Sequence, residues 1–330
     1  MYKADPKRYE KMIYRRLGNS GLKLPILSFG LWLNFGAVND YEKGKEMILK
    51  AFDNGITHFD LANNYGPPPG TAEEFFGKVL KEGLMEYRDE LIISTKAGFQ
   101  MWEGPYGDWG SRKYLMSSID QSLKRLGIPY VDIFYHHRFD PNTDLYETML
   151  ALRDIVLQGK ALYIGLSNYN SEQLKRAGKI LQELNVPFVI VQPRYNMLDR
   201  WAEDDNLFKT AYDLNAGVIA YSVLGQGKLT NKYIAGIPED SRAKKDYIVF
   251  MSEKDITEDL RKKLIKLDQI AKNRGQNIAQ MALSWALRDE LVTSALISTS
   301  KIEQLNENLE AIKKIDFSKE EIIEIEKALA

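Results

Sequence analysis

Short apolar runs alternate along the whole chain with longer stretches in which apolar residues recur at helical spacing. The strand-like runs, eight in number, are residues 26–31, 57–60, 91–96, 131–137, 161–167, 189–193, 218–221 and 295–297. The amphipathic stretches are residues 41–54, 71–82, 112–126, 145–158, 171–184, 207–214, 258–274 and 278–288. Repeated strand-then-helix order predicts a parallel sheet, and eight repeats favour closure into a (β/α)8 TIM barrel over an open doubly wound sheet.

Two further features agree with a barrel. The first strand is not followed by a GxGxxG motif, which a dinucleotide-binding doubly wound sheet would be expected to carry. A barrel also absorbs the 330 residues as one unit, so we expect a single domain over residues 1–330. Residues 13–25 predict an N-terminal β-hairpin that plugs the bottom of the barrel, and extra helices are expected at the C-terminal end.

Composition excludes several classes of function. The net charge is −1, whereas proteins that bind phosphate polymers carry a basic patch, so no nucleic-acid partner is expected. The chain has no cysteine and only three histidines, which excludes thiolate chemistry and leaves few ligands for a metal. No apolar run reaches the roughly 18 residues of a membrane span, and the N-terminus lacks a signal-peptide core. We therefore expect a cytoplasmic protein with a small-molecule partner and no metal.

Active sites of such barrels lie where the strands end and the following loops begin. The polar residues at these positions are Asp60, Lys96, His136, His137, Ser167, Asn168, Gln192, Tyr221 and Ser222, and Tyr65 follows Asp60 in the same loop. A buried Asp60 and Lys96 would pair across the barrel mouth, because either charge alone is costly to bury. The ammonium is expected to lower the pKa of Tyr65 from about 10 and so to make it a general acid.

A plainer interpretation exists for each of these residues. The Asp–Lys pair can be structural, Tyr65 can be packing, and Ser167 with Asn168 can cap the next helix. His136 and His137 are neighbours on a strand and point to opposite faces, so at most one lines the mouth. His58 lies within a strand and is expected in the core. The combination of residues favours catalysis over any single-residue interpretation.

Two loops are long for a compact domain, residues 98–111 and residues 225–255, and long loops are often functional. The first is rich in glycine and aromatic residues, and the expected substrate contacts are Trp32, Tyr65, Met101, Trp102 and Trp109. Arg112 either binds an anionic substrate group or is a surface charge at a helix start. The second loop contains GQGKLT (225–230), which lacks the first glycine of a P-loop and has Leu229 at the magnesium-binding position, but it can still cradle a pyrophosphate.

Three segments, FDLANNYG (59–66), STKAG (94–98) and VDIFYHHR (131–138), resemble motifs of the aldo-keto reductase family. The resemblance covers essentially the whole chain. Four further segments resemble the branch that holds bacterial glyceraldehyde 3-phosphate reductase-like enzymes and potassium-channel β subunits, namely YGPPPGTAEE (65–74), GPYGDWGSRKYL (104–115), DQSLKRLG (120–127) and GIPEDSR (236–242). The resemblance implies a catalytic tetrad of Asp60, Tyr65, Lys96 and His137. The family's histidine lies six residues after the valine of its strand-four motif, which selects His137 over His136, and His137 is then also an expected substrate contact.

The resemblance also implies the contacts of a nicotinamide cofactor. The residues at the nicotinamide end would be Ser167, Asn168, Gln192 and Tyr221. Those at the pyrophosphate would be Ser222, Leu224, Gln226 and Gly227, and those at the adenosine end Ser300, Lys301, Gln304 and Asn308. Further cofactor contacts are expected from Trp32, Asp60 and Lys228. A cation at position 301 favours the 2′-phosphate of NADPH. The family usually has arginine there, so NADH also stays open. The plainer interpretation is a Ser or Thr cap on a helix over residues 301–312.

We therefore expect NADPH-dependent reduction of aldehydes or ketones to alcohols, with Tyr65 as general acid. The side chains of the site cannot supply hydride, so the cofactor must. One alternative is a cofactor-sensing regulatory subunit of a partner protein. Another is a Schiff-base aldolase that uses Lys96, since lysines at barrel strand ends perform that chemistry.

Overall fold

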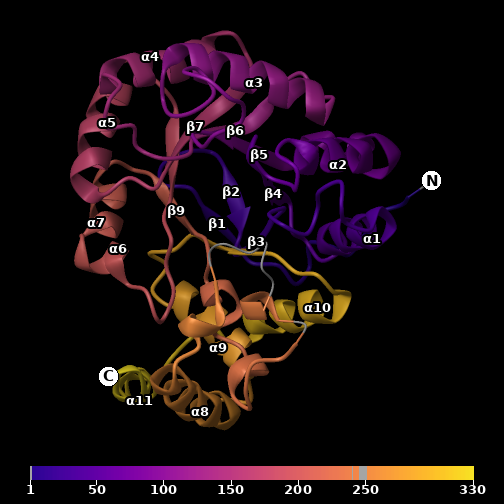
Figure 1. Ribbon diagram of the computed structural model, residues 1–330, viewed down its shortest axis with the longest axis vertical. Helices are drawn as coiled ribbons and strands as arrows, with labels where there is room; N and C mark the ends of the chain where they lie inside the picture. Colours follow the sequence, from indigo (N-terminus) through magenta and orange to yellow (C-terminus); the bar gives the residue numbers. More distant parts are fainter. Residues whose placement is uncertain (1, 240, 245–250) are drawn as a thin grey trace.

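The computed structural model describes residues 2–239, 241–244 and 251–330. In this part of the chain eight parallel strands close into a barrel in the order β10-β3-β4-β5-β6-β7-β8-β9 (Figure 1). Their bounds are β3 (Leu27–Gly30), β4 (His58–Asp60), β5 (Ile92–Ala97), β6 (Val131–His136), β7 (Ala161–Ser167), β8 (Phe188–Gln192), β9 (Gly217–Ala220) and β10 (Ser294–Ile297). Each strand lies within one residue of an expected run, so the barrel prediction is confirmed.

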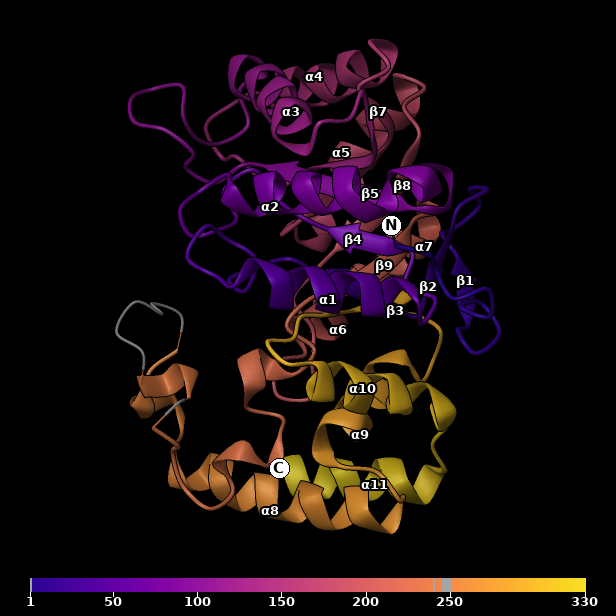
Figure 2. The same ribbon diagram turned by 90° about the vertical axis from the view of Figure 1, so that its right-hand side faces the viewer.

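Helices surround the barrel and turn their apolar sides toward it (Figures 1 and 2). They are α1 (Tyr41–Phe52), α2 (Thr71–Val79), α3 (Arg112–Leu126), α4 (Leu145–Leu157), α5 (Ser171–Glu183), α6 (Trp201–Asp204), α7 (Leu207–Asp213), α8 (Glu258–Asn273), α9 (Ile278–Leu287), α10 (Ile302–Glu310) and α11 (Lys319–Leu329). Many begin at a polar side chain that accepts a hydrogen bond from the first turn, as Ser111, Asn170 and Asn277 do. The helices α8 to α11 gather at one side of the barrel (Figure 2).

Local departures from the expected elements are small. The helix expected over residues 71–82 changes to a π-helical turn at Leu80–Leu84 and then to a 3₁₀ stretch at Met85–Glu90. The short helix α6 was not expected. Among the described residues no helix is long and apolar enough to cross a membrane. Residues 240 and 245–250 of the expected 225–255 loop lie outside the described residues.

The N-terminal hairpin closes the amino end of the barrel, as expected. Its strands β1 (Tyr14–Arg16) and β2 (Lys23–Pro25) pair antiparallel. Leu17 and Leu24 are fully buried, and they pack in one apolar cluster with residues of the barrel strands, namely Ile133, Tyr135, Val189, Ile190 and Ile219. The site must therefore be built at the opposite end, where the strands finish.

Candidate active site

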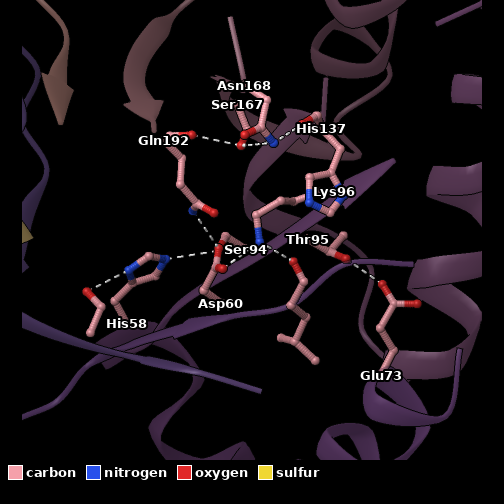
Figure 3. A network of polar contacts seen from close by, with 12 residues as sticks. His58, Asp60, Glu73, Ser94, Thr95, Lys96, His137, Ser167, Asn168 and Gln192 are labelled. Atoms are coloured by element: carbon pink, nitrogen blue, oxygen red, sulfur yellow. Dashed lines mark hydrogen bonds and ion pairs between the residues drawn. The ribbon is translucent and has the colours of Figure 1, made fainter. Parts of the chain in front are cut away.

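A buried ion pair lies at the carboxyl end of strands β4 and β5. The ammonium Nζ of Lys96 lies 2.5 Å from Oδ2 of Asp60 and 2.7 Å from the carbonyl oxygen of Leu61 (Figure 3). Both side chains are fully buried. Alternation along the strands explains the placement, because Asp60 and Lys96 occupy inward-facing positions on neighbouring strands. The expected pair is thus present in the geometry.

The second oxygen of Asp60 is also occupied. Its Oδ1 accepts a hydrogen bond of 2.6 Å from the Ser94 hydroxyl and one of 3.3 Å from Nε2 of Gln192 (Figure 3). Ser94 was not among the expected site residues. A signal was available: Ser94 precedes Lys96 by two residues, so both point into the barrel. Three side chains therefore fix the carboxylate in one orientation.

The surroundings of Lys96 act on its pKa in opposite directions. Burial lowers the pKa of the Lys96 ammonium, and the neighbouring Asp60 carboxylate acts in the opposite direction. Glu73 on α2 adds a smaller effect of the same sign as Asp60. Its buried carboxylate accepts a hydrogen bond of 2.5 Å from the Thr95 hydroxyl and binds Arg125 at 2.7 Å. Strand β5, which carries Lys96, thus makes polar contacts on both of its faces.

Tyr65 lies beside this pair. The Lys96 ammonium is 5.1 Å from the centre of the Tyr65 ring, and the ring of His137 is 5.9 Å from it. Trp32 covers another side at 6.4 Å between ring centres. The Tyr65 side chain is partly accessible at the barrel mouth.

The expected lowering of the Tyr65 pKa is wrong. Burial raises the pKa of the Tyr65 phenol well above 10, and the negative charge of Asp60 acts in the same direction. The reason is that the Lys96 ammonium is already bonded to Asp60 and Leu61, so it offers the phenolate little net attraction. Tyr65 is therefore a fully protonated phenol at neutral pH.

The two strand-four histidines face in opposite directions, as alternation requires. His137 faces Tyr65 and packs edge-on against Phe99, with 4.7 Å between ring centres. His136 points away, and its Nδ1 lies 2.6 Å from the Tyr169 hydroxyl. Burial lowers the pKa of His137 well below 6.5, and the nearby Lys96 charge adds to this effect. His137 is therefore neutral at pH 7.

The side chains expected near a nicotinamide form one hydrogen-bonded group. Ser167 donates to the carbonyl oxygen of Gln192 at 2.8 Å. Asn168 donates from Nδ2 to the carbonyl oxygen of His137 at 2.9 Å (Figure 3). Its Oδ1 accepts a hydrogen bond of 2.8 Å from the Tyr221 hydroxyl. The capping alternative for Ser167 and Asn168 is wrong, because Asn170 caps α5.

The segment expected at a pyrophosphate turns sharply after β9. Ser222, Gly225, Gln226 and Gly227 all have positive φ, between 54° and 98°. The partly exposed side chains of Leu224 and Lys228 belong to the same turn, and Lys228 Nζ lies 3.9 Å from Asp255.

The helix expected at the adenosine end starts one residue late, at Ile302, and among the described residues no side chain caps it. The plainer Ser or Thr cap is thus wrong, since Ser300 bonds through N and Oγ to the Gln304 side chain. Ser300, Lys301 and Gln304 are exposed, and Asn308 is buried.

The expected substrate-contact residues have different surroundings. Met101 and Trp102 are partly buried, and the Trp102 ring packs on Tyr114 at 5.1 Å, toward α3. Trp109 is exposed, and the Arg138 guanidinium lies 3.6 Å above its ring. Arg112 pairs with Asp154 at 2.6 Å on the surface, which favours the plain surface-charge interpretation. Among residues 2–239, 241–244 and 251–330, no cluster of metal-ligating side chains occurs.

Comparison with known proteins agrees with this geometry. The sequence model of the Aldo/keto reductase family matches residues 26–330. The chain is 53% identical over 329 residues to "L-glyceraldehyde 3-phosphate reductase" of Escherichia coli O157:H7, covering 99% of this chain and 95% of the relative. The protein of the same name from Escherichia coli K12 is 52% identical over the same shares. A "Probable voltage-gated potassium channel subunit beta" of Arabidopsis thaliana is 34% identical over 305 residues, 91% of each chain.

Proposed function

Since the chain belongs to the aldo/keto reductase family, we propose that it reduces an aldehyde or ketone to an alcohol with NADPH as the hydride source. The observation that carries the proposal is the buried Asp60–Lys96 pair with protonated Tyr65 and neutral His137 beside it. These four side chains can give a proton and stabilise charge, but they cannot give hydride.

The surrounding residues fit a nicotinamide dinucleotide. When bound, such a cofactor would supply the hydride. Ser167, Asn168 and Gln192 would hold its carboxamide beside the tetrad, with the Tyr221 ring against the nicotinamide. The turn of left-handed residues from Ser222 to Lys228 and the uncapped N-terminus of α10 suit phosphate groups, which bind backbone N–H groups at such places.

The preference for NADPH rests on Lys301. Its exposed ammonium belongs to the residue that directly precedes α10, where the N–H groups of the first turn also favour an anion. A 2′-phosphate there would meet both the helix and the cation, with Ser300 and Gln304 beside it. NADH lacks this phosphate and would gain neither contact.

Tyr65 is the proposed proton donor. Its raised pKa keeps the proton on the phenol at neutral pH, which is the form that reduction consumes. As negative charge develops on the substrate oxygen, that oxygen becomes basic enough to take the proton from Oη. The Lys96 ammonium, 5.1 Å from the ring centre, is largely neutralised by Asp60 and adds only a small stabilisation to the phenolate that remains.

His137 orients the carbonyl oxygen. Its Nδ1 is buried without a hydrogen-bond partner in the described part of the chain. A buried N–H group without an acceptor is rarely tolerated, so we place the ring proton on Nε2. Nε2–H is then a neutral donor for the same oxygen that Tyr65 protonates. Neutrality matters, because a charged imidazolium would compete with Tyr65 as the acid.

The names of the relatives guide the choice of substrates. Two relatives that share more than half of this sequence are called L-glyceraldehyde 3-phosphate reductase. We propose small hydroxyaldehydes and their phosphate esters as the first substrate class to measure. NADPH consumption with such a panel, compared between the wild type and Tyr65→Phe, tests the proposal. Absence of turnover on every carbonyl, or unchanged turnover in the variant, would overturn it.

A regulatory subunit is the second candidate function. The observation that favours it is the similarity to proteins named as probable potassium-channel β subunits. Against it stands the complete tetrad, which a pure sensor would not require. Tight NADPH binding without turnover, together with a recovered partner protein, would favour this candidate.

A Schiff-base aldolase has less support. The Lys96 ammonium is fully buried and already bonded to Asp60 and the carbonyl oxygen of Leu61, so it is poorly placed to attack a carbonyl carbon. Borohydride trapping decides the question, because an aldolase gives a covalent adduct on Lys96 and the reductase gives none.

A further inference from the structure

A line of hydrogen-bonded side chains crosses the barrel interior and ends on Asp60. It starts at Ser294, whose Oγ lies 2.6 Å from Oγ of Ser28. Ser28 lies 2.9 Å from Nδ1 of His58, and Nε2 of His58 lies 2.9 Å from Oγ of Ser94. Ser94 in turn donates to Asp60 at 2.6 Å (Figure 3). All five residues are fully buried.

The line follows the order of the strands. Its members belong to β10, β3, β4 and β5, which are consecutive neighbours in the barrel. Ser94 and Lys96 share one face of β5, as His58 and Asp60 share one face of β4, because side chains alternate along a strand. The polar line therefore runs beneath the tetrad and meets it from inside the barrel.

The number of available protons requires all hydrogen bonds in this line to point in one direction. An ionised carboxylate only accepts, so the one hydroxyl proton of Ser94 goes to Asp60. Oγ of Ser94 must then accept from His58, which requires the proton on Nε2. Burial lowers the pKa of His58 to about 4, so the ring is neutral and its Nδ1 is an acceptor. Ser28 therefore donates to Nδ1 and accepts from Ser294.

We propose that His58 is a positioning residue of the reductase site, which it serves by directing the Ser94 hydroxyl onto Asp60. The inference rests on the proposed function. Every donor in the line points toward Asp60, and aligned hydrogen bonds in a dry interior polarise and strengthen one another. The Asp60 carboxylate is thereby fixed under Lys96, and Lys96 is fixed beside Tyr65. His58 never touches the substrate.

The tautomer of His58 can be measured directly. Long-range proton–nitrogen correlation spectra distinguish the two neutral forms of imidazole, and the chain has only three histidines, so single substitutions assign the signals. The expected form carries the proton on Nε2 at pH 7. A proton on Nδ1 would overturn the proposal, even in a protein that reduced no carbonyl.

Two amide variants separate positioning from packing. In His58→Gln the side-chain amide can still donate to Ser94, whereas in His58→Asn the shorter amide reaches only toward Ser28. We expect kcat within about threefold of wild type for His58→Gln. We expect a loss on the order of tenfold for His58→Asn and for Ser94→Ala, since hydrogen bonds to charged groups are the strong ones.

A matched control removes a buried hydroxyl elsewhere. Ser284 on α9 is equally buried and bonds to Gln276 and to the carbonyl oxygens of Gln280 and Ala311. Ser284→Ala should lower the unfolding temperature and leave kcat unchanged. Equal kcat in the wild type and Ser94→Ala, or equal losses in His58→Gln and His58→Asn, would overturn the proposal. Failure of the wild type to reduce any carbonyl would instead contradict the proposed function. The tautomer measurement would still test the proposal about His58.

Discussion

Nζ of Lys96 lies 2.5 Å from Oδ2 of Asp60, and neither side chain is exposed to solvent. Such a pair holds its geometry because each partner removes the penalty of burying the other. Breaking a buried pair by removing one partner is much more damaging than replacing both partners with apolar groups. Single and double substitutions of this pair can therefore separate its effect on stability from its effect on turnover.

Asp60→Asn should destabilise the protein by about 3–5 kcal/mol, because it leaves the Lys96 ammonium buried without a countercharge. The double variant Asp60→Asn with Lys96→Met should recover most of that loss and still have negligible turnover. Urea unfolding gives the free energies, and NADPH consumption gives the activity. A double variant as unstable as the single one would contradict this account of the pair.

Tyr65→Phe should lower kcat by about 10²–10⁴-fold, the usual contribution of a general acid. Its fold should be retained, since the structure gives the Tyr65 hydroxyl no hydrogen bond among the described residues. Tyr169→Phe is the matched control, because its hydroxyl bonds to His136 on the outer side of β6. That control should reduce stability by about 1 kcal/mol and keep turnover.

Reduction should be insensitive to pH between about 6.5 and 9. Burial holds the pKa of Tyr65 above 10, so the proton donor stays protonated throughout this range. Burial also holds the pKa of His137 below 6.5, so its neutral form is lost only on the acidic side. The measurement is kcat/KM at saturating NADPH across the range. A fall with an apparent pKa between 7 and 9 would show that a different group limits the reaction.

Lys301→Ala should weaken NADPH binding by about 5-fold, the effect of losing one exposed charge contact, and should leave NADH binding unchanged. Lys313→Ala is the control, because Lys313 pairs with Glu310 just beyond the other end of the same helix. Dissociation constants from protein fluorescence check both variants. Equal weakening of the two cofactors would place the 2′-phosphate elsewhere.

Leu24→Ala should lower the free energy of unfolding by about 2–5 kcal/mol, because Leu24 is fully buried in the plug at the amino end of the barrel. Turnover at 25 °C should not change, since the tetrad lies at the opposite end. Leu157→Ala is the comparison: that side chain is 74% exposed and should change stability by less than about 0.5 kcal/mol. Loss of activity without loss of stability would link the plug to the site.

The barrel could be predicted from the sequence because its signal is repeated. Each strand is a short apolar run, and each helix that follows has the helical period, so an error at one element does not change the whole. The short helix α6 and the π-helical turn at Leu80–Leu84 were missed for the opposite reason. They depend on packing around particular side chains rather than on a period.

The sequence predicted which residues form the site better than it predicted the pKa values of those residues. The strand ends placed Asp60 and Lys96 together. Alternation allowed only one of His136 and His137 at the barrel mouth, and the family resemblance selected His137, which does face Tyr65. The predicted direction of the Tyr65 pKa shift was wrong, because the shift depends on how far the phenol is buried among its neighbours and on how much of the Lys96 charge Asp60 already neutralises. Neither quantity is visible in a linear sequence.

The N-terminal hairpin has a consequence for the order in which ligands bind and leave. Leu17 and Leu24 close the amino end of the barrel, so the described residues leave the carboxyl end as the approach to Tyr65. Two ligands that pass through one entrance cannot arrive in arbitrary order when one of them sits beneath the other. The ligand nearer the barrel floor must enter first and leave last, and initial-rate and product-inhibition kinetics would then have the form of a compulsory-order reaction.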